Sequence, residues 1–479
     1  DSTDGAAVRV AMTVGVPGKH PGVLQKVVKE VEAGTEDAAE VSLSQQTGHI
    51  FSDLTIGSDV AGTAGLRSNE GISNRGMMLF GSGFILTEEE ALLLGLNKVA
   101  VIKPYVNGKD LTATTRGAFV IDLDGYSAEE VKTQFPEVYQ WVVDRVKPER
   151  DANRDAAIRN KWWLFGRTRP DLRAPLKGLG RYIATPETAK HRFFVFLDQS
   201  ILPDNALVNI ALDDAYYLGV LSSQIHITWA LAAGGRLGVG NDPRYNKTRC
   251  FETFPFPACN PAQQAKIRAL AEQLDAHRKR QQALHPGLTM TGMYNVLEAV
   301  RAGATLNAKE KQIYEQGLVG ILKQLHDELD AAVAEAYGWS ADLPAEEILS
   351  RLVALNAERA AEEAKGMVRW LRPAYQAPAA SGTAASSQSP QAQQTSLEVE
   401  AAPVAAASAV REWPAELPAQ AAALRQVLNE VEALCTVEEI AAHFGPKAGK
   451  KRLAEMERLL QTMAAVGAVK VWNGKWVGV

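Results

Sequence analysis

The sequence predicts an α+β protein in which a mixed sheet is followed by a helical region and a small C-terminal domain. Three observations support this prediction. Short apolar runs separated by turn residues occupy 100–260, helical periodicity replaces them after Pro261, and 376–412 consists mainly of Ala, Ser, Gln, Pro and Thr. With about 150 residues per domain, a chain of 479 residues suggests about three domains.

The first 60 residues or so are expected to form a strand, a turn, a helix and a second strand. Val8–Val16 is rich in β-branched residues and predicts a strand. Val23–Val31 predicts a short amphipathic helix, and Ala39–Leu43 predicts a short strand. The chain begins with Asp rather than Met and enters a β-pattern almost at once, so we expect it to be a piece of a longer protein.

Residues 66–260 are expected to hold an irregular mixed sheet. Thr87 should cap a helix that has an acidic first turn and ends at Gly95. Phe135-Pro136 marks a break within a helical stretch over 127–146. The expected strands are 99–104, 119–123, 181–184, 192–197 and 207–210, and a mostly buried helix is expected over 213–229.

The rest of the chain predicts a helical region, a linker and a further domain. Residues 261–375 should form a helical hairpin or small bundle, with helices over 262–284, 309–337 and 344–365. The segment 376–412 cannot bury much apolar surface and should be a flexible linker. Residues 413–479 predict helices over 421–434, 437–444 and 450–465 and a hairpin around Asn473-Gly474, the layout of a winged helix.

Composition excludes several classes of protein. Lys and Arg number 51 and Asp and Glu 56, and the resulting net charge of −5 excludes a histone-like polycation. The three cysteines are too few for a disulfide framework and indicate a reducing cytoplasm. No apolar run approaches the roughly 20 residues of a membrane span. The sequence contains no nucleophile elbow, no phosphate-binding loop and no metal-ligand spacing among its eight histidines.

Two local features suggest a nucleotide or DNA site. Phe80-Gly81-Ser82-Gly83 precedes a helix but lacks the third glycine of a dinucleotide fingerprint, so we interpret it as a turn. Lys447, Lys450, Lys451 and Arg452 precede the last helix of the C-terminal domain, which in a winged helix can enter the major groove. Glu455 and Glu457 dilute that charge, and protein binding is the alternative.

The segment 161–192 is basic although the whole chain is acidic. It holds eight positive and two negative residues, a net charge of +6, with tryptophan, phenylalanine and tyrosine interleaved. Cations bind phosphates, and arginine can pair with base edges in a bidentate manner. The alternative is a solvated basic face with Trp162 and Trp163 in the core. The candidate DNA-binding residues of this segment are Lys161, Trp163, Arg167, Arg169, Arg173, Arg181 and Lys190.

A second candidate is the polar, glycine-rich stretch 236–249. It lies between the expected buried helix and the Phe254-Pro255-Phe256-Pro257 sequence, and loops in such positions can carry specificity. The alternative is a plain surface loop. The candidate residues are Arg236, Arg244, Tyr245, Asn246, Lys247 and Arg249.

Several stretches, each weak alone, are specific in their order and spacing. The two strongest are Gly219-Val220-Leu221-Ser222-Ser223 and Phe251-Glu252-Thr253-Phe254-Pro255-Phe256-Pro257. The others are 67–76, 81–86, 102–111, 119–122, 135–139 and 146–150, with 326–330 and 336–339 in the helical region. Over about 8–372 the chain resembles the C-terminal, target-recognition part of MmeI-like and type IIG-like adenine-N6 DNA methyltransferases of restriction–modification or phage-defence systems.

The resemblance implies a DNA target-recognition domain over 66–260 and the end of a methyltransferase-like α/β domain over 1–65. In this family a catalytic domain precedes that region, with a glycine-rich S-adenosylmethionine motif and an Asn/Asp-Pro-Pro-Tyr/Phe motif for a flipped adenine. Neither motif occurs in this sequence. No catalytic, cofactor-binding or metal-binding residue is therefore carried over. This segment alone is expected to be inactive, and S-adenosylmethionine is implied only for the full enzyme.

The resemblance also implies the partners. They are double-stranded DNA, a methyltransferase domain and, as a further class, other defence-system proteins. The expected localisation is the cytoplasm, and no membrane is expected as a partner. The 236–249 residues would read bases, each good bidentate pair contributing about 1–3 kcal/mol of discrimination, while 161–192 would hold phosphates. The alternative is a stand-alone DNA-specificity or scaffold subunit of a defence complex, with no catalytic activity.

Overall fold

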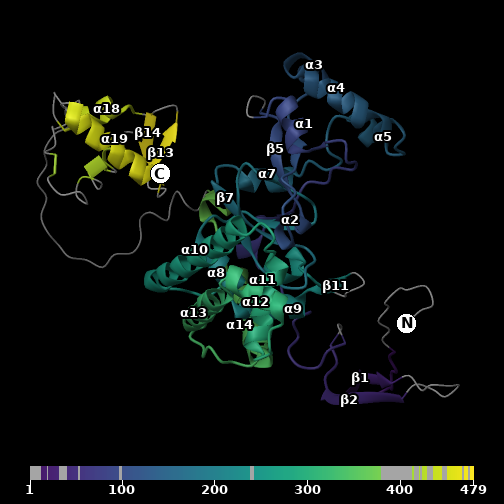
Figure 1. The fold of residues 1–479 in the computed structure, drawn as a ribbon. Helices are drawn as coiled ribbons and strands as arrows, with labels where there is room; N and C mark the ends of the chain where they lie inside the picture. The colour runs from purple at the N-terminus through teal and green to yellow at the C-terminus, as the bar shows by residue number, and fades with distance from the viewer. Residues whose placement is uncertain are drawn as a thin grey trace, which may run out of the picture. The chain divides into compact units, whose positions relative to one another are not determined.

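The computed structural model divides the chain into two compact units, Asp1–Ser387 and Gln388–Val479 (Figure 1). The structure describes residues 12–18, 20–31, 40–51, 54–96, 100–237 and 242–378 of the first unit. In the second unit it describes 413–414, 420, 423–424, 426–428, 435–444, 450–465, 469–472 and 475–478. Each unit is considered by itself.

The N-terminal segment forms a two-stranded antiparallel hairpin. Strand β1 (Gly22–Val31) pairs with β2 (Glu40–Gly48), and the register shifts between Val27 and Lys29. The predicted strand over 39–43 is confirmed, but the helix predicted over 23–31 is wrong. Its β-branched valines favour an extended chain, and pairing with β2 supplies the hydrogen bonds that a helix would have made internally. Of the strand predicted over 8–16, residues 12–16 are not in a strand, and 8–11 lie outside the described residues.

Two four-stranded sheets form the centre of the first unit, as the α+β prediction requires. One sheet has the order β3 (Ser73–Arg75), β10 (Leu207–Ile210), β7 (Arg181–Pro186) and β8 (Val195–Asp198), and all its pairs are antiparallel. The other has the order β4 (Ile85–Leu86), β6 (Phe119–Ile121), β5 (Ile102–Val106) and β9 (Leu202–Pro203). The parallel pairing of β5 with β9 makes this second sheet mixed.

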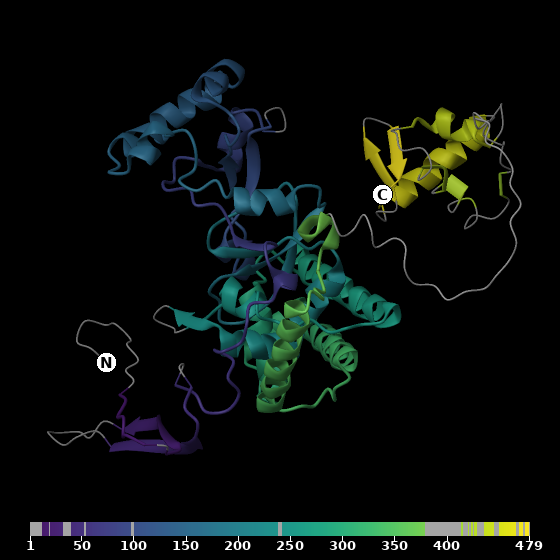
Figure 2. The same cartoon turned by 180° about the vertical axis from the view of Figure 1, so that it is seen from behind.

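Short helices surround the second sheet. They are α1 (Glu88–Leu93), α2 (Gly108–Thr112), α3 (Ala128–Gln134), α4 (Pro136–Arg145), α5 (Lys147–Asp151), α6 (Ala156–Asn160) and α7 (Pro170–Leu176). Thr87 and Glu90 form a capping box at the start of α1, which confirms the predicted cap. Phe135 separates α3 from α4, as Phe135-Pro136 predicted. Figures 1 and 2 show α3, α4 and α5 together at the end of the unit away from the long helices.

The first sheet shares one apolar core with the long helices. These are α8 (Ala215–Ser222), α9 (Gln224–Ala233), α10 (Pro261–Leu284), α11 (Met290–Arg301), α12 (Ala308–Gln316), α13 (Val319–Tyr337) and α14 (Ala345–Ala364), followed by the short α15 (Pro373–Gln376). The helix predicted over 213–229 is broken at Ser223, whose side chain caps α9. The helix predicted over 309–337 is broken where Leu318 takes a left-handed conformation, with a φ of 43°.

Hydrogen bonds between distant segments join α14 to the segment before the first sheet. The Glu363 carboxylate accepts the main-chain amides of Arg67 at 2.7 Å and Ser68 at 2.9 Å. The Asn356 amide bonds the main chain of Ala64 in both directions and donates to the Thr253 carbonyl. The first sheet and the long helices therefore form one folded body with a shared core.

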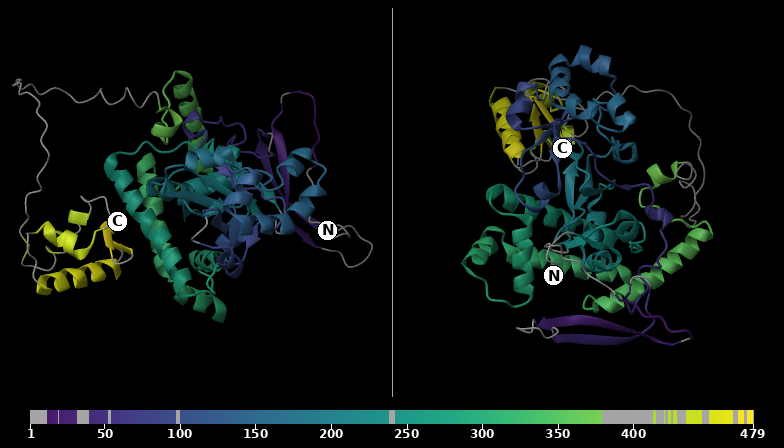
Figure 3. Two further views of the ribbon diagram at one scale, coloured as in Figure 1. Left: turned by 90° about the horizontal axis from the view of Figure 1, so that it is seen from above. Right: turned by 90° about the vertical axis from the view of Figure 1, so that its right-hand side faces the viewer.

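The second unit contains α18 (Val437–Ala442), α19 (Lys450–Ala465) and a hairpin of β13 (Val469–Trp472) and β14 (Lys475–Gly478). Figure 3 shows the hairpin beside α19. Trp476 and Cys435 exchange main-chain hydrogen bonds at 2.7 and 2.9 Å, so the hairpin is tied to the segment just before α18. These elements agree with the predicted winged-helix layout. Much of the helix predicted over 421–434, Asn473-Gly474 and Lys447 lie outside the described residues.

Candidate nucleic-acid interface

Residues from the two segments predicted to contact DNA meet in one groove of about 470 Å³, here called the Glu187 groove. Arg169 comes from the basic segment, and Arg244 to Lys247 come from the polar stretch before the Phe-Pro-Phe-Pro sequence. The groove is lined by Asn74, Arg75, Arg169, Asp171, Glu187, Val208, Arg244, Tyr245, Asn246, Lys247 and Thr248. The fold thus converts two separate sequence features into one surface.

Glu187 lies at the centre of this groove between two arginines. Its Oε2 is 2.5 Å from Arg75 Nη2, and its Oε1 accepts Arg244 Nε at 3.0 Å and Nη2 at 2.7 Å. The Glu187 side chain is 13 % exposed, whereas those of Arg75 and Arg244 are 37 % and 38 % exposed. One buried carboxylate therefore fixes two guanidinium groups whose outer parts still face solvent, and the trio keeps one net positive charge.

Main-chain contacts hold the Arg244 segment against the end of β7. Strand β12 (Asp242–Arg244) pairs with β11 (Gly235–Leu237), and Arg244 also forms a bridge to Thr188. Tyr245 N donates to the Glu187 carbonyl at 2.7 Å. The buried guanidinium of Arg192 adds a link, because its Nη2 donates to the Pro243 carbonyl at 3.1 Å. Arg244 is thus positioned by the sheet as well as by its own ion pair.

Arg169 lies at the edge of the groove in a left-handed conformation. Its φ of 57° is uncommon for a residue other than glycine, and it immediately precedes Pro170, the first residue of α7. The Arg169 Nε donates to the Arg75 carbonyl at 3.1 Å, and its Nη2 lies 3.5 Å from Asp171 Oδ2. This turn directs the Arg169 guanidinium toward β3, beside Arg75.

A second cavity, of about 490 Å³, adjoins the groove and is here called the basic cavity. Arg169 and Asp171 line both spaces, so the two are neighbours. The basic cavity also carries Lys161 and Arg167, which are exposed. Three of the predicted residues of segment 161–192, namely Lys161, Arg167 and Arg169, therefore lie along one continuous surface.

Four other predicted residues of segment 161–192 are engaged elsewhere. Arg173 pairs with the Asp122 carboxylate through Nη1 at 2.9 Å and Nη2 at 2.8 Å, and Arg181 pairs with Glu272. Lys190 Nζ donates to Asn295 on α11, and Trp163 Nε1 donates to the Tyr126 carbonyl at 2.9 Å. Each of these side chains has a partner within the protein, and none of them lines the Glu187 groove or the basic cavity. Their contact with DNA stays a prediction.

The structure places the Tyr245 side chain in the core, away from the surface at which the sequence suggested a DNA contact. Tyr245 is only 1 % exposed, and its ring packs edge-on against Phe194. The Tyr245 hydroxyl lies 3.0 Å from His226 Nε2, and burial raises the pKa of Tyr245 well above its usual value. The side chain is part of the core and cannot read a base in this conformation. Its main chain, which bonds Glu187, is what contributes to the groove.

The other loop candidates remain at the surface. Arg236 on β11 and Arg249 on the π-helix η2 (Lys247–Phe251) are exposed. Lys247 Nζ pairs with Glu252 at 2.8 Å. The Asn246 amide oxygen caps η2 by accepting Thr248 N at 3.1 Å and Thr248 Oγ1 at 2.7 Å. Asn246 therefore presents its amide at the groove from a fixed position.

Sequence reasoning missed Arg75 and Glu187 as site residues. Arg75 lies in a stretch that supported the family resemblance, and Glu187 was counted only as a charge opposing the basic segment. A usable signal was present in the second case: a lone carboxylate among arginines often holds guanidinium groups in place. Its partners could not be identified, because they lie 112 and 57 residues away in the sequence.

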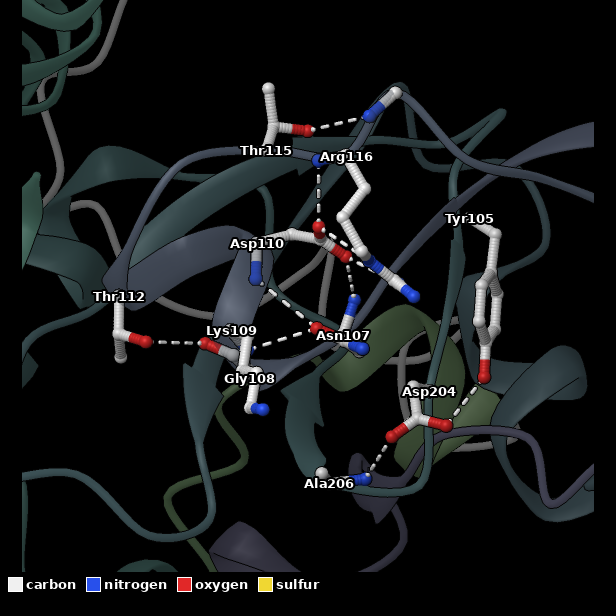
Figure 4. Close-up of polar contacts among 11 residues, drawn as sticks. Tyr105, Asn107, Gly108, Lys109, Asp110, Thr112, Thr115, Arg116, Asp204 and Ala206 are labelled. Atoms are coloured by element: carbon white, nitrogen blue, oxygen red, sulfur yellow. Dashed lines mark hydrogen bonds and ion pairs between the residues drawn. The ribbon is translucent and has the colours of Figure 1, made fainter. Parts of the chain in front are cut away.

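A polar network near the groove holds the second sheet to the loop after β9 (Figure 4). The Tyr105 hydroxyl donates to Asp204, which also accepts Ala206 N at 2.8 Å. Burial, followed by the contact with Asp204, raises the pKa of Tyr105. Asp110 accepts Arg116 Nε at 3.0 Å and Nη2 at 2.8 Å; burial opposes its ionisation, but these bonds outweigh burial and lower its pKa. The network is therefore a structural support with matched charges.

Two further properties concern the described part of the chain only. Within the described ranges, no group of three or more His, Cys, Asp or Glu side chains is arranged to hold a metal ion. None of the described helices is long and apolar enough to cross a membrane.

Comparison with known proteins agrees with the geometry. Residues 67–258 match the family model described as the MmeI target recognition domain. The chain is 27 % identical over 154 residues to DNA methyltransferase A of Bacillus subtilis (strain 168), a stretch that covers 31 % of this chain and 14 % of that protein. The resemblance inferred from the sequence is thereby confirmed, and the family model matches it over residues 67–258.

A solved structure extends the likeness of the fold. It is that of the type IIL restriction–modification enzyme MmeI in complex with DNA, with a TM-score of 0.52 and 20 % sequence identity. The match covers 67 % of this chain and 40 % of the MmeI chain, so this chain spans less than half of either relative. The likeness confirms the α+β architecture.

Proposed function

We propose that this chain is the DNA target-recognition part of an S-adenosylmethionine-dependent adenine-N6 DNA methyltransferase of a restriction–modification or phage-defence system. The observation that carries the proposal is the Glu187 groove, in which one carboxylate holds Arg75 and Arg244 side by side. The match of 67–258 to the MmeI target recognition domain supports it, as does the fold shared with an MmeI structure that contains DNA.

The proposed chemistry follows from the groove's charge. Its lining holds four cations, Arg75, Arg169, Arg244 and Lys247, against two carboxylates, those of Asp171 and Glu187. Such an excess attracts the phosphate backbone, while a fixed guanidinium can donate two hydrogen bonds to guanine O6 and N7. We assign base reading to the Glu187 groove and phosphate binding to Lys161 and Arg167 of the basic cavity.

The glycine turn at Phe80-Gly81, the candidate weighed for a nucleotide-like ligand within the described residues, does not fit S-adenosylmethionine, so no step is routed through that cofactor. Phe80 and Gly81 form a turn with φ values of 54° and 127°, and a Cβ on Gly81 would lie 2.6 Å from the Glu149 carboxylate. That turn has no room for a ligand phosphate or carboxylate against its main chain. In the proposed enzyme this chain binds and orients the duplex, and methyl transfer belongs to a domain outside this sequence.

Binding measurements with the full chain test the proposal. Fluorescence anisotropy would follow a labelled duplex carrying the site selected from a random pool, and a scrambled duplex, across a salt titration. Arg244→Ala should reduce the ratio of the two affinities by about 5- to 150-fold, the loss of one bidentate contact. Arg167→Ala should weaken binding to both duplexes and reduce the salt slope by about one unit.

The matched control is Lys266→Ala. This lysine is exposed on α10 and pairs with Glu335, away from both cavities, so its removal should change neither measurement. The proposal fails if the parent chain enriches no sequence and binds no duplex, or if Arg244→Ala and Arg167→Ala both behave as the control does.

A further inference from the structure

The basic cavity contains an exposed aromatic ring in a strained position. Phe80 has a φ of 54°, a conformation that bulky residues rarely adopt, and is 41 % exposed. Its ring lies directly against Gly166, where an added Cβ would be 2.0 Å from the ring carbon Cδ2. The backbone therefore holds this ring at the rim of the cavity, outside the core and against another main chain.

The same cavity is backed by an unpaired positive charge. Arg150 is 1 % exposed, and its Nη2 donates to the carbonyls of Leu79 at 2.6 Å and Leu164 at 3.2 Å. Its Nε and Nη1 have no hydrogen-bond partner, and Glu149 acts on the guanidinium through its charge without a direct ion pair among the described residues. A buried guanidinium with unsatisfied donors is unfavourable, and a bound anion would relieve that cost.

Two exposed cations complete the lining. Arg167 exchanges main-chain hydrogen bonds with Met78 at 3.0 and 3.2 Å, and Gly166 N donates to the Leu79 carbonyl at 3.2 Å. These bonds place Arg167 beside the segment that carries Phe80. Lys161, which directly follows α6, also lines the cavity. The acids of the lining are already engaged: Asp155 caps α6, and Asp171 faces Arg169.

We propose that the basic cavity binds one nucleotide of a DNA strand whose base is displaced from the stack. The phosphate would lie against Lys161 and Arg167 with Arg150 behind it, and the base would stack on Phe80. Cations with an aromatic ring are the combination that holds single-stranded nucleotides, and only an unstacked base offers its face to such a ring. The inference rests on the proposed function and adds to it a site separate from the base-reading groove.

The test compares two labelled duplexes, one fully paired and one with a single unpaired adenine, bound by the full chain. The parent should prefer the duplex with the unpaired adenine. Phe80→Gly removes the ring and suits the left-handed backbone, so it should fold at least as well as the parent in thermal unfolding. It should reduce the preference by about 5- to 150-fold and leave binding of the paired duplex unchanged.

Two further variants separate the site from general effects. Lys161→Ala should reduce the salt slope for the unpaired-adenine duplex by about one unit. Leu93→Ala removes another exposed apolar side chain, on α1 and outside the cavity lining, and should leave the preference intact. The inference is overturned if the parent shows no preference, if Phe80→Gly retains it, or if Leu93→Ala abolishes it. Binding of the paired duplex by the parent decides the proposed function independently.

Discussion

Replacing Glu187 by glutamine should alter sequence discrimination and general DNA affinity in opposite directions. The substitution keeps the shape of the side chain but removes the charge that holds Arg75 and Arg244 at 2.5 and 2.7 Å. The glutamine amide can still accept one guanidinium, but its NH₂ group faces the other and repels it. At least one arginine should therefore lose its fixed position at the groove.

The magnitudes follow from these contacts. Hydrogen bonds to charged groups contribute about 1.5–3 kcal/mol, and the partial exposure of both arginines lowers that contribution to about 1 kcal/mol for each pair. Glu187→Gln should therefore reduce the free energy of unfolding by about 1–2 kcal/mol. Loss of one bidentate base contact should lower discrimination by about 5- to 150-fold. The extra net positive charge should at the same time tighten binding to scrambled DNA, most at low salt.

The assay is the ratio of dissociation constants for the selected and scrambled duplexes, measured at two salt concentrations. The control is Glu272→Gln, which removes the carboxylate that pairs with Arg181 at 2.5 Å, outside the groove. Discrimination that stays at the parental level in Glu187→Gln would refute the role given to this carboxylate. Weaker binding to scrambled DNA would refute the electrostatic part of the reasoning.

Two predictions concern acid sensitivity of the fold. Burial opposes ionisation of Asp122, but Arg173 and Lys103 outweigh burial and lower the pKa of Asp122. The contribution of this carboxylate to stability is therefore present above the usual aspartate pKa of about 3.9, and it is lost as pH falls through the folded pKa. Arg173→Ala should reduce unfolding free energy by about 3 kcal/mol and flatten this acid dependence in urea titrations, since Lys103 alone remains. Burial raises the pKa of Asp330 to about 6, above its unfolded value of about 3.9, so stability should fall as pH rises between these values. Asp330→Asn, which keeps an acceptor for Gln224 N at 2.6 Å, should abolish that fall; a parental pH profile would contradict it.

The elements that the sequence predicted well are those specified by neighbouring residues. The cap at Thr87 and the break at Phe135-Pro136 depend on side chains within one helical turn, and both occur as expected. The prediction for the first strand of the β1–β2 hairpin was wrong, because the choice between helix and strand for Val23–Val31 depends on pairing with a segment about 20 residues away. The broken helix at Leu318 depends on a left-handed residue that no local composition required.

The same distinction explains which site residues could be found. Arg169 and Arg244 were identified because positive charge is visible in any basic or polar stretch. Arg173 and Arg181 looked equivalent, but the acids that neutralise them, Asp122 and Glu272, lie 51 and 91 residues away. Which surface an arginine joins is decided by such distant partners, so the sequence could not separate the arginines that line the two cavities from those that lie elsewhere.

The charge of that segment therefore has several roles. Arg173 and Arg181 are paired with acids, and Arg192 is buried, where loss of hydration lowers its pKa to about 10 and its donors bond carbonyl oxygens. The charge that faces the two cavities instead combines Lys161 and Arg167 with arginines from β3 and β12. A surface built from a few fixed cations releases few counter-ions, so its affinity depends less on salt than a net +6 stretch would suggest. Under the proposed function, specificity depends on how firmly Glu187 holds its two arginines, so one carboxylate would matter more to DNA reading than most of the basic residues around it.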